Sequence, residues 1–250
     1  MRILRVLFPH PACFGSYGPC FLPRHASRLL SQLWHSFKHT RNGNTDSEIS
    51  HSATYRNPFY DYISSTAIPN PANNVTAQES LSLVDGGEAL QNNPIFPFLQ
   101  PARNVSVILV NDNTADTSNN FPNGSEILTT YVQSFNHGLT RMPFIPSVET
   151  FIAEGLNQRA TFFGCNDTSK ITIVYLPNFN FTYASNTATT QLEYPKTETA
   201  GIIANGVSIA SQGGKEGWGT CLGCALMMKT GQTLPGGCAA CFEEYCYYGS

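Results

Sequence analysis

The hydrophobic and polar positions of this chain predict four strands. Residues 80–84 alternate polar and apolar side chains, a period of two that is typical of a half-buried strand. Residues 105–110 are nearly all apolar and β-branched, which predicts a strand covered on both faces, as in a parallel sheet between helices. Two further apolar runs, residues 160–163 and 171–176, predict two more strands, which a short loop joins.

Apolar side chains recur at helical spacing in two other segments, residues 125–136 and 197–211. We expect Ser125 to cap the first helix, after a turn at 121–124, and Gly138 to close it. The side chains expected to face inward are Ile127, Leu128, Tyr131, Val132 and Phe135 in the first helix, and Ile202, Ile203, Val207 (or Gly206), Ile209 and Ala210 in the second. Residues 42–79 are polar and contain several prolines, which predicts loop. Strands that alternate with amphipathic helices predict an α/β fold with a mostly parallel sheet flanked by helices.

The turn after the first predicted strand carries a candidate acid. Asp85 is followed by Gly86 and Gly87, and two glycines permit a sharp turn that other residues resist. A carboxylate at the end of a strand is a usual catalytic position in α/β folds. Asp-Gly is also a very common turn dipeptide, so these residues alone leave a purely structural role open.

The segment around this turn is L-x-L-V-D-G-G-E-x-x-Q-N-x-P at residues 81–94, and it resembles the aspartate motif of the fungal lysophospholipase/phospholipase B family. The resemblance covers about residues 55–250, with departures at Ala89, where we expect an acidic residue, and at Asn93, where we expect an apolar one. The further matching motifs, in order, are Asn57-Pro-Phe-Tyr60, Ala115-Asp-Thr117, Phe121-Pro-Asn-Gly124, Thr161-Phe-Phe-Gly-Cys165, Val174-Tyr-Leu-Pro-Asn178 and the cysteine-rich end.

The resemblance implies a patatin-like, α/β-hydrolase-related fold and a lysophospholipase activity that releases a fatty acid through a Ser/Asp dyad, with no metal or organic cofactor. Asp85 matches the general base, and Gly86 and Gly87 shape its turn. The G-x-S-G-G that carries the serine in the family does not occur in this sequence, nor does the glycine-rich turn that supplies oxyanion donors. We therefore expect residues 46–250 to be the C-terminal portion of a catalytic domain truncated on its N-terminal side, and the chain alone to be inactive.

Four other residues are weaker candidates for catalysis. Asp112 and Asp116 follow the strand at 105–110, where a polar loop is the simpler interpretation. His137 is expected in the last turn of a helix, where a protonated imidazole would meet the negative helix end. Ser208 lies in a G-x-S-x-A segment that lacks the preceding strand a nucleophile elbow requires.

Six cysteines lie in the family-like part of the chain, and their spacing allows two interpretations. Two C-x-x-C pairs would suit a tetrahedral zinc site in a cytosolic protein, or disulfides in an oxidising compartment. The family resemblance favours disulfides that tie down a C-terminal tail. The cysteines are Cys165, Cys221, Cys224, Cys238, Cys241 and Cys246.

Charge and targeting signals separate residues 1–45 from the rest. This segment has 6 basic residues and no acidic one, so residues 46–250 carry 8 basic (14 minus 6) and all 17 acidic residues, a net charge of −9. That sign does not suggest a nucleic-acid partner. The leader lacks the unbroken apolar run of a signal peptide, and we interpret it as disordered or artefactual. The chain contains no transmembrane run.

The resemblance implies a secreted or cell-surface glycoprotein that meets lysophospholipid or phospholipid at a micelle or membrane surface. Sequons for N-glycosylation begin at Asn74, Asn104, Asn123, Asn166 and Asn180. The alternative is a non-catalytic binding fragment. Such a fragment would either pair with a complementary half through an exposed sheet edge or hold zinc through the C-x-x-C pairs.

Overall fold

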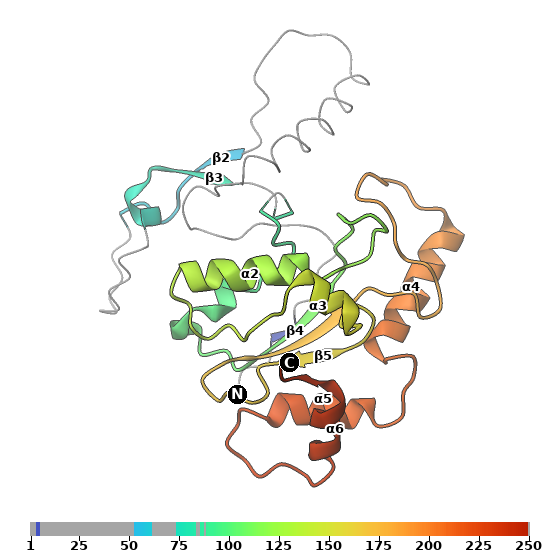
Figure 1. The fold of residues 1–250 in the computed structure, drawn as a ribbon. Coiled ribbons are helices and arrows are strands. Elements are labelled where there is room, and N and C mark those ends of the chain that lie inside the picture. The colour runs from blue at the N-terminus through green and yellow to red at the C-terminus, as the bar shows by residue number, and fades with distance from the viewer. Residues whose placement is uncertain (1–3, 6–52, 62–73, 84–85, 88, 250) are drawn as a thin grey trace. The chain divides into compact units, whose positions relative to one another are not determined.

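The computed structural model describes residues 4–5, 53–61, 74–83, 86–87 and 89–249. The chain divides into two compact units: Ala12–Ala89, and Met1–Pro11 with Leu90–Ser250. The larger unit contains most of the described elements (Figure 1). Val84, Asp85 and the interpretation of residues 6–45 lie outside the described residues.

The larger unit has strands, short 3-10 helices and α-helices in an alternating order. Its strands are β1 (Leu4–Arg5), β4 (Val107–Asp112), β5 (Thr161–Phe163), β6 (Thr172–Pro177) and β7 (Cys246–Tyr247). Its helices are η2 (Phe96–Leu99), η3 (Pro101–Arg103), α2 (Ser125–Asn136), α3 (Val148–Ala153), α4 (Lys196–Ala210), α5 (Trp218–Met227) and α6 (Cys238–Tyr245). None of the helices in the described ranges is both long and apolar enough to span a bilayer.

The sheet of the larger unit has the strand order β1-β4-β6-β5-β7. Strand β4 is parallel to β1 and β6, and β5 is parallel to β7. Strand β5 is antiparallel to β6, because the short loop between them folds the two strands into a hairpin. The sheet is therefore mixed, and the α/β class and the strands at 105–110, 160–163 and 171–176 are confirmed with ends shifted by one or two residues.

Helices cover both faces of this sheet, and each face has its own apolar core. Helices α2 and α3 lie on one face, and α5 and α6 lie on the other (Figure 1). The first core includes Ile108, Val110, Ile127, Phe151 and Tyr175, and the second includes Val107, Phe162, Val174, Trp218 and Tyr245. Because successive strand residues face opposite sides, β4 and β6 contribute to both cores, which explains their continuous apolar sequences.

The smaller unit contains an antiparallel pair that the sequence did not predict. Strand β2 (Ala53–Arg56) pairs with β3 (Ser80–Leu83), and the 3-10 helix η1 (Asn74–Ala77) precedes β3. The prediction of loop throughout residues 42–79 was therefore wrong. The alternation in β3 is confirmed, with Leu81 and Leu83 half-buried and Ser80 and Ser82 exposed.

The two predicted helices form, but their buried faces differ from those expected. Helix α2 begins after Gly124, which has a φ of +87° and occupies the N-cap position assigned to Ser125. Val132 and Phe135 are 46% and 78% exposed, whereas the side chains of Glu126, Thr130 and Ser134 are buried. In α4, Ile203 and Val207 are exposed and Asn205 is fully buried. Hydrogen bonds to loops, described below, orient both helices and override their apolar spacing.

Candidate active site and its surroundings

Asn57 organises the loop that precedes β3. Its side-chain Nδ2 donates to the carbonyl of Gln78 at 2.7 Å, and its Oδ1 accepts from the N–H of Phe59 at 2.9 Å. Its backbone N–H donates to the carbonyl of Glu79 at 2.9 Å. The Asn57-Pro-Phe-Tyr60 motif is thus a turn that holds the start of β3 in place.

The Asp-Gly-Gly turn is only partly described. Asp85 lies outside the described residues, so its role as the general base stays a prediction. Gly86 and Gly87 lie in a turn, in which the N–H of Ala89 donates to the carbonyl of Gly86 at 3.2 Å. This geometry agrees with the turn that the sequence predicts after β3.

The segment that follows the turn is held by a buried acid. The backbone N–H of Asn92 donates to Oε2 of Glu126 at 2.7 Å, and the Glu126 side chain is 2% exposed. Glu126 lies in the first turn of α2, where the helix dipole favours a negative charge. Ile95 and Leu99 then enter the core beneath α2. Glu126 therefore fixes the path of the chain in the last part of the aspartate motif.

The carboxyl end of β4 carries a buried hydrogen-bonded acid. Oδ1 of Asp112 accepts from the N–H and the hydroxyl of Thr114, at 2.9 and 2.6 Å. Oδ2 accepts from the phenol of Tyr175 at 2.6 Å. Burial, the charge of Asp112 and this hydrogen bond raise the pKa of Tyr175 well above its usual value, and Glu126 adds to the effect. The phenol therefore stays neutral as a donor.

These hydrogen bonds indicate that Asp112 has a structural role. Its side chain is 1% exposed, and each of its oxygens already accepts a hydrogen bond. A general base must reach the proton that it removes from a nucleophile or substrate. Asp116 instead lies at the surface, where its Oδ1 accepts from the hydroxyl of Thr189 at 2.7 Å.

Asn178 and Asn205 anchor the loop that follows β6 at the same edge of the sheet. Nδ2 of Asn178 donates to the carbonyl of Ser185 at 2.9 Å, and its backbone N–H donates to the carbonyl of Asp112 at 2.7 Å. Oδ1 of Asn205 accepts from the N–H groups of Phe181 and Thr182, both at 3.0 Å. These contacts explain why Asn205, rather than Ile203 or Val207, faces inward on α4.

His137 and Ser208 lie on helices, and neither is in a turn that follows a strand. His137 caps the C-terminal end of α2, about 16 Å of helix from Glu126. Its ring makes an edge contact with Phe96, with centroids 5.4 Å apart. The Ser208 hydroxyl donates to the carbonyl of Ala204 at 3.1 Å within α4, and no strand-to-helix turn exposes it.

Two glycines in the motifs have steric roles. A Cβ on Gly124 would lie 2.5 Å from the ring of Phe151, and one on Gly164 would lie 2.3 Å from the carbonyl oxygen of Ile171. Both residues have positive φ, +87° and +84°, a conformation that side chains disfavour. The Phe-Pro-Asn-Gly and Phe-Gly-Cys motifs thus mark the entry to α2 and the turn of the β5–β6 hairpin.

The six cysteines form three disulfides, as the family resemblance implies. The pairs are Cys165–Cys246, Cys221–Cys241 and Cys224–Cys238. The last two join α5 to α6, and the first joins the β5–β6 loop to β7. With their sulfurs paired in this way, these cysteines are not thiolate ligands for zinc.

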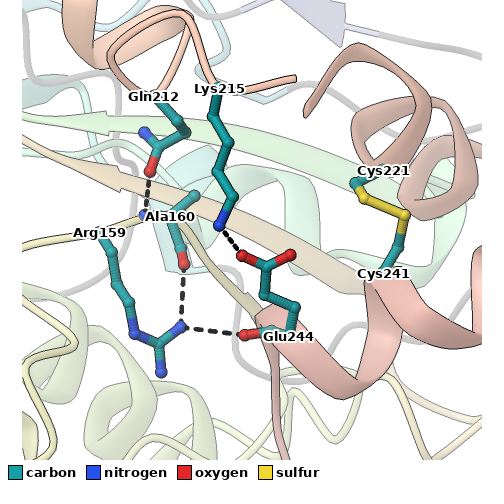
Figure 2. A network of polar contacts seen from close by, with 7 residues as sticks. All are labelled: Arg159, Ala160, Gln212, Lys215, Cys221, Cys241 and Glu244. Atoms are coloured by element: carbon teal, nitrogen blue, oxygen red, sulfur yellow. Dashed lines mark hydrogen bonds and ion pairs between the residues drawn. A yellow bond between two sulfur atoms is a disulfide. The ribbon is translucent and has the colours of Figure 1, made fainter. Parts of the chain in front are cut away.

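Polar contacts also hold α6 in place (Figure 2). Lys215 forms an ion pair with Glu244, and Oε1 of Gln212 accepts from the N–H of Ala160 at 2.7 Å. Arg159 donates to the carbonyls of Ala160 and Glu244 at 3.3 and 3.4 Å. The start of β5 is thereby tied to the C-terminal helix.

Comparison with known proteins decides the family. The model of the lysophospholipase catalytic domain matches residues 22–250. The chain belongs to the lysophospholipase catalytic-domain family. Lysophospholipase 1 of Aspergillus fumigatus is 41% identical over 223 residues, which cover 83% of this chain and 34% of that protein. A lysophospholipase of Arthroderma benhamiae is 42% identical over 210 residues, covering 78% of this chain and 32% of that protein.

A more distant member of the lysophospholipase family is also similar. The probable lysophospholipase 3 of Schizosaccharomyces pombe is 34% identical over 222 residues, covering 79% of this chain and 33% of that protein. The chain thus spans about a third of the length of these curated relatives. No solved structure matches the chain.

Several residues that shape this part of the lysophospholipase domain escaped sequence reasoning. Glu126, Tyr175 and Asn205 are each buried, although they lie in segments interpreted by their apolar spacing. The available signal was the position of Glu126 at a helix start and of Tyr175 inside an otherwise aliphatic strand, two residues before Pro177. Helices α5 and α6 were also missed, because the segment reads as a glycine- and cysteine-rich tail.

Proposed function

We propose that this chain supplies the acid-bearing part of a lysophospholipase, which hydrolyses the carboxylic ester of a lysophospholipid to a fatty acid and a glycerophosphodiester. The match to the catalytic-domain family over residues 22–250 carries the proposal. In this mechanism Asp85 is the general base that takes the proton of a serine nucleophile. Gly86 and Gly87 give its turn the required shape. No metal or organic cofactor takes part.

The reaction also needs a nucleophile and oxyanion donors. The 250-residue sequence contains no G-x-S-G-G, the motif that carries the nucleophile in the family. An aspartate alone does not attack an ester carbonyl or stabilise the oxyanion that forms. We therefore expect the 250-residue chain by itself to be inactive and to become active with a polypeptide that carries those groups.

The test measures fatty-acid release from 1-palmitoyl-lysophosphatidylcholine. The purified chain should release no more than the buffer does. Co-expression with the other two thirds of A. fumigatus lysophospholipase 1 should restore hydrolysis, and Asp85→Asn should abolish it. Asp167→Asn, at a surface loop, is the matched control and should retain the restored activity. Hydrolysis by the chain alone, or retained activity in Asp85→Asn, would contradict the proposal.

A second candidate function is that of a non-catalytic fragment that pairs with a complementary polypeptide through its sheet. Among the described residues, the two-residue strand β1 lies at one edge of the sheet and pairs with Ile108 and Leu109 of β4. A fragment of this kind would bind its partner at a sheet edge, because backbone groups at an edge favour strand addition. Stable co-purification of the two polypeptides without any hydrolysis would support this function over the first.

The zinc-binding form of this alternative makes a different prediction. Thiol titration of the denatured, unreduced chain should find Cys165, Cys221, Cys224, Cys238, Cys241 and Cys246 blocked if the disulfides form. Free thiols together with stoichiometric bound zinc would instead support the metal-binding module. The three disulfides favour the first result, and they support a secreted or cell-surface location, since such bonds persist in oxidising compartments.

A secreted or cell-surface protein can be N-glycosylated, and we include this modification in the proposal. Asn104, Asn166 and Asn180 are exposed. Asn123 is half-buried, and its Oδ1 accepts from the N–H of Ser125 at 3.0 Å. The side chain of Asn74 lies outside the described residues. Peptide mapping after expression in a fungal host should find glycans at the three exposed sites and a vacant Asn123.

A further inference from the structure

Five side chains from three separate parts of the larger unit form a continuous apolar surface, which we call the aromatic patch. It consists of Tyr131, Val132 and Phe135 of α2, Phe144 of the α2–α3 loop and Tyr247 of β7. Phe144 contacts Tyr131 edge-on, with ring centroids 5.7 Å apart, and stacks with Tyr247 at 6.4 Å. Phe135 lies one helical turn from Tyr131, and such pairs are neighbours on a helix surface.

The patch is exposed although its residues are large and apolar. Phe135 is 78% exposed, Phe144 55% and Val132 46%. Tyr131 and Tyr247 are half-buried, with one side against the core under α2. The largest contiguous apolar patch on a soluble domain is often a functional surface.

We propose that the aromatic patch docks onto the surface of a zwitterionic lipid aggregate, an inference that rests on the proposed lysophospholipase function. The area of the patch favours a lipid over a protein partner. An aromatic side chain offers about 150–250 Å², so the exposed parts of the patch amount to roughly 300–500 Å². Each partner in a standard protein interface contributes about 800 Å².

The composition of the patch also suits a lipid–water boundary. Phe135, Phe144 and Val132 supply apolar surface that can enter the region between headgroups and acyl chains. The two tyrosines border this surface and combine an apolar ring with a polar hydroxyl. Such side chains are favoured where one end is apolar and the other is hydrated.

The net charge of the part of the chain that carries the patch indicates which kind of lipid surface the patch would bind. Residues 90–250, which carry the patch, have a net charge of −4, from 7 basic and 11 acidic residues. Near the patch, Glu154 acts on Tyr247, whose pKa is raised by burial first and by that carboxylate second. An anionic surface would repel this part of the chain, whereas a phosphatidylcholine surface carries no net charge.

The chain offers a matched control surface on α4. Ile203 and Val207 are 63% and 64% exposed, so they present apolar side chains to solvent as fully as the patch does. They are aliphatic, and no aromatic ring lies between them in the helix sequence. Substituting these two residues with serine therefore shows the effect of a more polar surface alone, without any change to the aromatic patch.

The test is flotation of the full chain with phosphatidylcholine vesicles, with circular dichroism to verify folding. The chain should bind, and Phe135→Ser/Phe144→Ser should weaken partitioning by about tenfold or more, because the two rings no longer transfer from water into the lipid. Phe135→Ser alone, at the most exposed position, should weaken it by severalfold without affecting the fold. Ile203→Ser/Val207→Ser should bind like the unmodified chain.

Other outcomes would overturn the inference. These are no binding by the unmodified chain, equal loss in the α4 variant, or a larger loss of binding to anionic vesicles than to phosphatidylcholine vesicles in Phe135→Ser/Phe144→Ser. A dimer in light scattering that Phe135→Ser/Phe144→Ser dissociates would assign the patch to a second copy of the chain instead. Because flotation requires no hydrolysis, failure of the lysophospholipase proposal in the co-expression assay remains a separate result.

Discussion

The phenol of Tyr175 donates a 2.6 Å hydrogen bond to Oδ2 of Asp112, so a buried side chain of β6 holds the last residue of β4. The two strands are in parallel register, with Val110 opposite Tyr175 and Asp112 opposite Pro177. The bond therefore crosses between strands toward their carboxyl ends, where the loops that follow both strands begin. From within the core, it holds the carboxyl ends of these two inner strands together.

Removing the phenol should destabilise the fold. Tyr175→Phe keeps the ring but leaves Oδ2 of Asp112 buried with one donor fewer, which should cost about 1–3 kcal/mol. Urea unfolding should show a lower midpoint at an unchanged slope. Tyr194→Phe, at a residue 44% exposed, should stay within about 0.5 kcal/mol. Equal midpoints for the two variants would contradict a stabilising role for the bond.

The raised pKa of Tyr175 predicts alkaline sensitivity. The folded chain favours the protonated phenol, so the resulting stability is complete below the ordinary tyrosine pKa of about 10 and is lost as the pH rises above it. The pKa values of Tyr245 and Tyr247 are also raised, chiefly by burial. Unfolding free energy measured from about pH 8 to 11 should fall, and it should fall less steeply in Tyr175→Phe. Parallel curves would assign the loss to other groups.

Gly124 should tolerate substitution poorly. Gly124→Ala adds a Cβ 2.5 Å from the Phe151 ring at a φ of +87°, so backbone strain and overpacking together should cost about 2–6 kcal/mol. Gly138→Ala is the matched control, because its φ of +66° brings strain but its Cβ would meet nothing within 4 Å. It should cost about 1–2 kcal/mol. Thermal unfolding of both variants measures the difference, and similar losses would show that the Phe151 contact is easily relieved.

The three disulfides should contribute unequally. Cys165–Cys246 spans 81 positions, and replacing both cysteines by serine should cost about 4–5 kcal/mol. Cys221–Cys241 encloses Cys224–Cys238, so its removal frees only the short stretches between them, at about 2 kcal/mol. Chemical denaturation of the two double variants gives the order. A larger loss for Cys221→Ser/Cys241→Ser would mean that the α5–α6 pair depends on both of its bridges.

Replacing Asn93 with an apolar residue should stabilise the fold. Its Nδ2 is buried and has no hydrogen-bond partner among the described residues, at a position where the family resemblance leads us to expect an apolar residue. Asn93→Leu removes this unpaired donor and should stabilise the chain by about 1–3 kcal/mol. Asn113→Leu, at an exposed position, should change stability by less than about 0.5 kcal/mol. A loss of stability in Asn93→Leu would mean that the site is too small for the branched side chain.

The sequence predicted best those elements whose burial is complete. Strands β4 and β6 are covered on both faces, so their apolar runs are unambiguous. Strand β2 was missed because four residues among prolines give no period, and only its pairing with β3 defines it. Sequence reasoning sees the residues of one segment, whereas such a strand depends on a partner 24 or more positions away.

The faces of the helices were harder to predict, because apolar spacing was the only criterion. In α2, that criterion placed Phe135 inside, whereas Glu126 is buried because it binds the backbone of Asn92. In α4, the amide of Asn205 binds the backbone of the loop at 181–182 and turns Val207 outward. A polar side chain that satisfies a distant backbone group leaves no periodic signal. The position of Asp85 after a strand made it a candidate, whereas its role as general base was inferred from the family resemblance and stays a prediction.

The Cys165–Cys246 bond closes a covalent ring that contains β6, α4, α5 and α6. A protease that cuts one peptide bond in this stretch, such as in the exposed segment around Leu192, therefore releases no fragment. The two pieces remain one molecule until the bond is reduced. In an oxidising environment, this part of the protein is thus protected against loss of its C-terminal helices after a single cleavage.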